Sequence, residues 1–152
     1  MSEKRSLLII DDEHHLIESI ERILIDEPIA VHQAKNGKEG LKSVLSKSPE
    51  AVVVDYKMPE MNGLEFIKAV KSLRPDLPVV VMTAQGDRQT SIEFLKEGAF
   101  RYLEKPFNPD EFKFIVKDAV SHYRLLTEKN KLKNIVHLDT SSNQMIGESE
   151  SM

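Results

Sequence analysis

The chain has 152 residues, of which 40% are hydrophobic and 30% are charged, and its formal net charge at pH 7 is −4. This length suits one domain with a hydrophobic core and some additional chain. The absence of cysteine excludes disulfides and thiolate metal sites and fits a reducing compartment. The acidic balance disfavours nucleic-acid binding by this segment. Without a signal peptide or a run of about 18 apolar residues, we expect a cytoplasmic protein that does not enter a membrane.

The first part of the chain alternates apolar, strand-like segments with segments of helical period. Strands are predicted at Ser6–Ile10, Ile29–Ala34 and Ala51–Val54. Each is followed by apolar residues spaced as on one face of a helix. These faces comprise Leu16, Ile17, Ile20, Ile23 and Leu24, then Leu41, Val44 and Leu45, then Leu64, Ile67, Val70 and Leu73.

The second part continues this alternation. Strands are predicted at Pro78–Met82 and Phe100–Leu103, and Ile92 and Leu95 mark the apolar face of a helix between them. The last helix begins at Asn108-Pro109-Asp110-Glu111, where an N-cap residue precedes a proline and two acids. Strict strand-then-helix alternation over about 120 residues predicts an α/β fold, with a parallel sheet covered by helices on both faces.

Polar side chains stand where these predicted strands end. Asp11 and Asp12 follow the first strand, Asp55 follows the third, Thr83 follows the fourth, and Lys105 comes just past the fifth. Sheets of this kind bind ligands outside the carboxyl ends of their strands. We therefore expect three carboxylates, a hydroxyl and an ammonium group at one edge of the sheet.

This set of groups suits the acceptance of a phosphoryl group. Crowded carboxylates need a compensating cation, and oxygen ligands without His or Cys suit Mg²⁺. A carboxylate can act as a nucleophile and form an aspartyl phosphate. A metal ion and a lysine would neutralise the transferring group, and the small Ala84 after Thr83 would leave room for the donor.

Four segments of the chain carry a family resemblance: LLIIDDE (7–13), VVVDYKMPEMNG (52–63), VVVMTAQGD (79–87) and GAFRYLEKPFNPDE (98–111). In order and spacing they resemble the CheY-like receiver domain of two-component response regulators. The resemblance implies a doubly wound, flavodoxin-like, five-stranded parallel sheet of order 2-1-3-4-5 with five flanking helices. The receiver would occupy residues 1–123.

The resemblance also implies the metal and acceptor residues. Asp55 would be the phosphoacceptor. Mg²⁺ would bind Asp55 and Asp12 directly, Asp11 largely through water, and the backbone carbonyl of Lys57. The donor would be the phosphohistidine of a sensor histidine kinase, so the chain would need no ATP site.

The switch residues follow from the same resemblance. Lys105 would contact the phosphoryl oxygens, and its peptide bond to Pro106 would be cis. Thr83 would turn its hydroxyl onto the new phosphoryl group, and Tyr102 would follow from an outward to an inward rotamer. Both would change a switch face, defined as the surface of the fourth helix, fifth strand and fifth helix.

Several of these residues have structural alternatives. Asp11 and Asp12 suit the N-terminus of the first helix as caps, Thr83 is a good strand former, and a half-buried tyrosine such as Tyr102 is common. The five histidines show no metal-binding spacing and are expected on helix faces or the surface. As a hypothesis, Lys57 and Gln85 border the path of the water that hydrolyses the acyl phosphate.

Beyond the receiver, residues 124–138 are predicted to extend the last helix into a linker. Leu125, Leu132, Ile135 and Val136 fall near heptad spacing, which favours a homodimer through this helix, although a solvated extension is also open. The switch face is the other surface through which a homodimer could form. Residues 139–152 are predicted to be flexible.

The final segment MIGESESM resembles the start of the AAA+ module in NtrC-type, sigma-54-dependent transcriptional regulators. The chain has neither a Walker A motif nor a helix-turn-helix, so neither ATP hydrolysis nor DNA recognition is expected of it.

Other function classes fit the sequence less well. A stand-alone receiver acting through protein contacts remains open. A haloacid-dehalogenase-like phosphatase would need an acid two residues after its nucleophile, where this chain has Lys57, and also a cap insertion. A nucleotide-binding module would need G-x-G-x-x-G after the first strand. An interaction module that has lost phosphorylation is disfavoured by the intact residue set.

Overall fold

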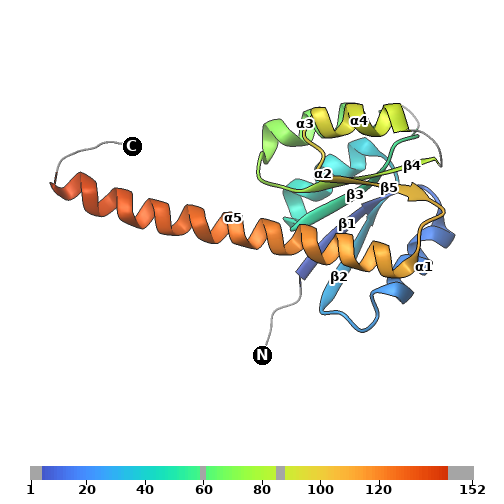
Figure 1. The fold of residues 1–152 in the computed structure, drawn as a ribbon, viewed down its shortest axis with the longest axis horizontal. Coiled ribbons are helices and arrows are strands. Elements are labelled where there is room, and N and C mark those ends of the chain that lie inside the picture. Colours follow the sequence, from blue (N-terminus) through green and yellow to red (C-terminus); the bar gives the residue numbers. More distant parts are fainter. Residues whose placement is uncertain (1–4, 59–60, 85–87, 144–152) are drawn as a thin grey trace.

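The computed structural model describes residues 5–58, 61–84 and 88–143, and the side chains of these ranges except those of residue 88 and residues 129–143. Strands and helices alternate through this part of the chain (Figure 1). In order they are β1 (Arg5–Ile10), α1 (His14–Ile23), β2 (Ile29–Ala34), α2 (Gly37–Lys47), β3 (Ala51–Asp55), α3 (Gly63–Leu73), β4 (Val79–Ala84), α4 (Arg88–Lys96), β5 (Arg101–Lys105) and α5 (Pro109–Asn143).

The five strands form one sheet of order β2-β1-β3-β4-β5, in which all neighbours pair in parallel. This confirms the predicted doubly wound α/β fold with five flanking helices. Alternate strand residues face opposite sides, and both sides are buried: Leu7 and Ile9 join one cluster, Leu8 and Ile10 the other. Burial of both faces explains why the strands are continuous apolar runs.

The helices divide between the two faces of the sheet. The first cluster packs the sheet against α1 and α5, for example through Ile20 and Phe112. The second packs the other face against α2, α3 and α4, through residues such as Val44, Phe66 and Phe94. Figure 1 shows the same layers, with α1 and α5 on one side and α2, α3 and α4 on the other.

Side-chain caps fix where three of the helices begin. Asn36 accepts a hydrogen bond from the Glu39 amide at 2.9 Å, at the start of α2. Asn62 and Glu65 form a reciprocal capping box at the start of α3. Asn108 accepts from the Asp110 amide at 2.8 Å, which confirms the predicted start of α5. Each cap satisfies amides that the first helical turn leaves without partners.

Three strands continue past their predicted carboxyl ends, and the first of them is β3, which includes Asp55. β4 runs to Ala84 and β5 to Lys105, because the parallel ladder pairs Thr83 with Glu104 and Ala84 with Lys105. Thr83 and Lys105 therefore lie within their strands rather than beyond them. Backbone pairing with a neighbouring strand holds both residues at fixed positions along the sheet edge.

Four residues of the predicted apolar helix faces are exposed rather than buried. Leu45, Leu73, Ile92 and Leu95 have exposed fractions of 64%, 47%, 40% and 42%. In α4 the inward stripe is formed instead by Ser91 and Phe94, which turns Ile92 and Leu95 outward. Helical spacing identifies an apolar stripe, but the packing of the helix decides which part of it is buried.

The last helix extends further than expected. α5 has 35 residues and continues to Asn143, past the boundary predicted at residue 138. Residues 139–143 contain no Gly or Pro, so no strong helix breaker stands there. Figure 1 shows α5 projecting well beyond the sheet. In the described residues, no helix is both long and apolar enough to cross a membrane.

Candidate functional site

The ammonium group of Lys105 joins two carboxylates at the carboxyl edge of the sheet. Its Nζ lies 3.2 Å from Oδ2 of Asp11 and 3.3 Å from Oδ2 of Asp55. These side chains come from the ends of β5, β1 and β3, so the strand order brings together residues far apart in the sequence. The structure thus brings together three of the predicted site residues.

Backbone amides hold the other carboxylate oxygens. Oδ1 of Asp11 accepts from the Glu13 amide at 2.8 Å, and Oδ1 of Asp55 accepts from the Lys57 amide at 3.3 Å. The N-cap position of α1 is Glu13, which makes no side-chain cap hydrogen bond. Asp11 therefore does not occupy the N-cap itself, and its second oxygen is directed to Lys105.

Because these three side chains are largely buried, their charges are stable only when they are paired with one another. The side chain of Asp11 is fully buried, while those of Asp55 and Lys105 retain exposed fractions of 16% and 27%. Burial raises the pKa of Asp55 above its usual value, and the nearby Asp11 carboxylate adds to this, while Lys105 and the Lys57 amide oppose it. For Lys105, burial acts to lower the pKa, but the Asp55 and Asp11 carboxylates outweigh it and the pKa is raised. The lysine therefore remains an ammonium group.

The carboxylate oxygens at this edge are of the chemical type that a magnesium ion takes as ligands in proteins. Among the described residues, no group of three or more His, Cys, Asp or Glu side chains is arranged to hold a metal. Asp12 is exposed, whereas Asp11 and Asp55 share Lys105. Mg²⁺ commonly takes only one or two carboxylates and completes its shell with waters and phosphate oxygens. A set of carboxylates without nitrogen or sulfur ligands therefore suits Mg²⁺.

Thr83 is buried, with an exposed fraction of 1%, on the strand next to Asp55. Its Oγ1 lies 3.5 Å from the Oγ of Ser91 in α4. Its hydroxyl is therefore directed to a helix of the predicted switch face.

A surface cavity of about 380 Å³ adjoins the carboxylates. Asp55, Tyr56, Lys57, Ala84 and Lys105 line it together with Pro106. The Lys105-Pro106 peptide bond is cis, as expected. The cavity gives a small donor group access to Asp55 past the methyl group of Ala84.

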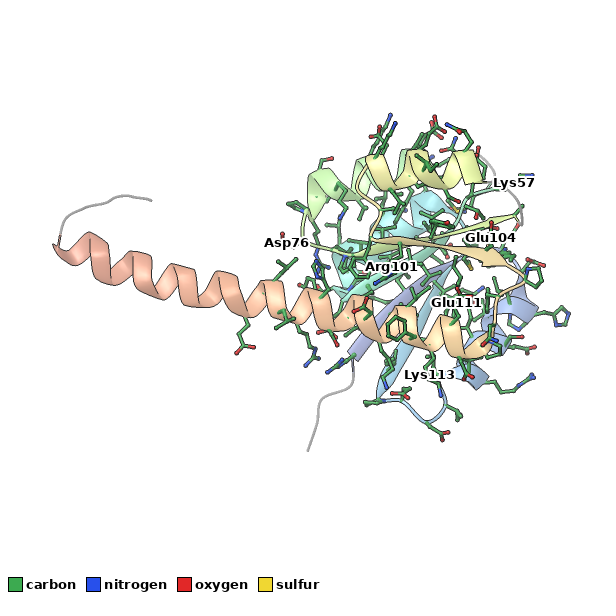
Figure 2. All side chains as sticks on the ribbon, viewed as in Figure 1. Lys57, Asp76, Arg101, Glu104, Glu111 and Lys113 are labelled. Carbon is green, nitrogen blue, oxygen red and sulfur yellow. The ribbon has the colours of Figure 1, made fainter. Side chains whose placement is uncertain are left out.

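A larger cavity of about 560 Å³ lies on the switch face. Its lining residues are Leu95, Phe100, Arg101, Tyr102, Glu104, Pro106, Glu111 and Ile115. Tyr102 is half-buried there. Figure 2 shows Lys57 near the carboxyl edge of the sheet, while Arg101, Glu104 and Glu111 lie along β5 and the start of α5.

The sequence did not reveal every contact of the site. Oε1 of Glu13 lies 3.6 Å from Lys105 Nζ, and only its position after two acids hinted at this. The contact between Thr83 and Ser91 had no motif to indicate it. His14 and His15 lie near Glu18, at 3.6 and 3.8 Å, in keeping with a surface role. Gln85 and the MIGESESM segment lie outside the described residues.

Comparisons with known proteins identify similar chains. The model of the family described as response regulator receiver domain matches residues 7–117. The DNA-binding transcriptional regulator NtrC of Escherichia coli (strain K12) is 35% identical over 144 residues, which are 95% of this chain and 30% of that protein. The chain spans about 30% of the length of the curated relatives it matches.

Solved structures show the same similarity. A response regulator receiver domain protein from Clostridium thermocellum has a TM-score of 0.74 and 31% identity, covering 80% of this chain and 98% of that chain. NtrX from Brucella abortus has a TM-score of 0.78 and 26% identity, covering 85% of this chain and 30% of that chain.

Proposed function

We propose, because the chain belongs to the family of response regulator receiver domains, that Asp55 is the residue that accepts a phosphoryl group. Members of this family are regulatory phosphoacceptors rather than classical enzymes. The observation that carries the assignment is the pairing of Lys105 Nζ with both Asp55 and the fully buried Asp11. An ammonium group at this position can neutralise phosphoryl oxygens attached to Asp55.

The proposed transfer takes the phosphoryl group from a phosphohistidine of a sensor histidine kinase. A carboxylate oxygen of Asp55 attacks phosphorus, the new P–O bond forms, and the N–P bond breaks. The imidazole leaves with the bonding electron pair and takes up a proton from the solvent. Lys105 neutralises the oxygens during the transfer, and the Asp55 cavity, open to solvent past Ala84, admits the donor.

Asp12, Asp55 and the backbone carbonyl of Lys57, with Asp11 acting largely through water, are the groups we assign to a magnesium ion. When bound, the ion would supply positive charge that Lys105 alone does not provide for a dianionic phosphoryl group. We also propose that the acyl phosphate hydrolyses on its own and that Lys57, exposed beside Asp55, influences its lifetime.

The output of this switch is proposed to be transcription. Thr83 and Tyr102 would transmit phosphorylation to the switch face of α4, β5 and α5, in a cytoplasmic regulator longer than this chain. The similarity to NtrC supports this, since that protein is described as a DNA-binding transcriptional regulator. Self-association would use the switch face or the extension of α5, and DNA contacts would lie outside this chain.

Acetyl phosphate with Mg²⁺ provides the direct test. The wild-type chain should gain the mass of one phosphoryl group, and Asp55→Asn should gain none, because an amide is a poor nucleophile. Asp26→Asn, which changes an exposed carboxylate, is the matched control and should behave as wild type. An unmodified wild-type chain, or an equal gain in Asp55→Asn, would remove the assignment.

A further inference from the structure

Helix α4 presents one polar side chain to the core. Ser91 and Phe94, one turn apart, have exposed fractions of 0% and 1%. The neighbouring apolar residues Ile92 and Leu95 are exposed instead. A buried serine on an inward stripe, with larger apolar residues turned outward, indicates that its hydroxyl is needed where it lies.

Both inward residues contact residues near the phosphoacceptor, namely Thr83 on the neighbouring strand β4 and Tyr56, which follows Asp55. The Oγ of Ser91 lies 3.5 Å from Oγ1 of Thr83. The ring of Phe94 meets the ring of Tyr56, the residue after Asp55, edge-on at 5.2 Å between centroids. These two contacts, one polar and the other apolar, join the inward side of α4 to the site, and the polar contact is to the residue proposed as the switch.

We propose that Ser91 is a positioning residue that holds the Thr83 hydroxyl toward α4 while Asp55 is unphosphorylated. The inference rests on the proposed function, in which Thr83 turns its hydroxyl onto the phosphoryl group. Since the Thr83 hydroxyl is buried, it is costly to leave without a partner. Ser91 and the phosphoryl oxygens therefore compete for the Thr83 hydroxyl. Phosphorylation of Asp55 would break the contact between Thr83 in β4 and Ser91 in α4.

This competition predicts the effect of removing the Ser91 hydroxyl. Ser91→Ala removes the partner of Thr83 in the unphosphorylated state and leaves its phosphoryl partner intact. Alanine is also a better helix former than serine, so the variant is expected to fold. Its affinity for a phosphoryl mimic should rise by about two- to ten-fold, the factor that corresponds to one net hydrogen bond.

Titration with beryllofluoride in the presence of Mg²⁺, followed by amide NMR, measures this affinity. Ser91→Ala should bind more tightly than wild type, while Ser43→Ala, a buried helical serine in α2, should not change. In a Thr83→Ala background the effect of Ser91→Ala should vanish, because the shared hydroxyl is gone.

The outcomes separate this inference from the proposed function. If wild type binds no beryllofluoride and gains no phosphoryl group, the proposed function fails. If wild type binds but Ser91→Ala has equal or weaker affinity, Ser91 does not restrain Thr83. An affinity gain that persists in the Thr83→Ala background also overturns the inference, since it would act through the helix alone.

Discussion

At the scale of single residues, Lys105 determines the chemistry of the site. Its ammonium is the cation shared by Asp11 and Asp55, and Glu13 adds a third carboxylate at 3.6 Å. Buried carboxylates are costly unless paired, and here two of them depend on one lysine. The unphosphorylated site therefore carries more negative than positive charge, which favours the binding of a further cation.

The raised pKa of Asp55 predicts how the stability of the protein depends on pH. Burial raises the pKa of Asp55 above its ordinary value of 3.8, so the folded protein keeps the proton to a higher pH than the unfolded chain does. The contribution of Asp55 to stability is therefore most favourable at low pH and is lost as the pH rises from 3.8 through the raised pKa.

Asp55→Asn is uncharged at every pH and should be more stable than wild type at pH 7 when divalent ions are chelated. The gain in free energy of unfolding should shrink as the pH falls through the raised pKa of Asp55 towards 3.8. Urea denaturation across pH measures the difference, with Asp26→Asn as the exposed control. A variant less stable than wild type at pH 7 would contradict this sign.

At the scale of elements, the middle of α5 is clamped to the edge of the sheet opposite the site. Arg124 makes a two-pronged contact with Glu50, at 2.9 Å and 3.2 Å, and Glu50 also accepts from the Ser6 amide at 3.2 Å. One residue earlier, the Tyr123 hydroxyl accepts from Arg74 at 2.8 Å, and the guanidinium lies over its ring. Paired guanidinium–carboxylate bonds are among the stronger polar contacts.

A comparison of two ion pairs on α5 tests this clamp. Arg124→Ala should lower the free energy of unfolding by about 1–3 kcal/mol, since it breaks a partly buried bidentate pair. Lys117→Ala breaks a single contact to Glu27 from a side chain that is 51% exposed, and should cost less than about 1 kcal/mol. Urea denaturation and hydrogen exchange of α5 measure both, and equal losses would argue against a clamp.

At the scale of the whole molecule, the topology assembles the site and the sequence revealed most of it. Continuous apolar strands followed by Asp11 and Asp55 identified the parallel sheet and the carboxyl edge at which the site lies. Strand order came from the family resemblance, since periodicity alone does not specify neighbours. The contacts of Glu13 and Ser91 depend on side-chain positions that no spacing encodes. The outward turn of Ile92 and Leu95 was missed because their helix packs through a serine.

The contacts of α5 also indicate which part of the chain forms the folded unit. Among the side chains that the structure describes, those that hold this helix to the body lie between Phe112 and Arg124. A chain ending at Glu128 should therefore keep the wild-type urea midpoint and beryllofluoride affinity. If the extension carries self-association, sedimentation should show a weaker dimer for the shortened chain. A lost fold would show that residues after Glu128 support the domain.

The unbroken course of α5 has a mechanical consequence. A helix of 35 residues is about 50 Å long, and its first turns border the same surface as Tyr102 and Glu104. Beyond its clamp at Arg124 the helix continues for 19 residues, or about 30 Å, and this part can act as a lever arm: a tilt of about 5° at the clamp would carry the far tip through roughly 2–3 Å. A shift too small to disturb the core at one end could thus change which groups meet at the other.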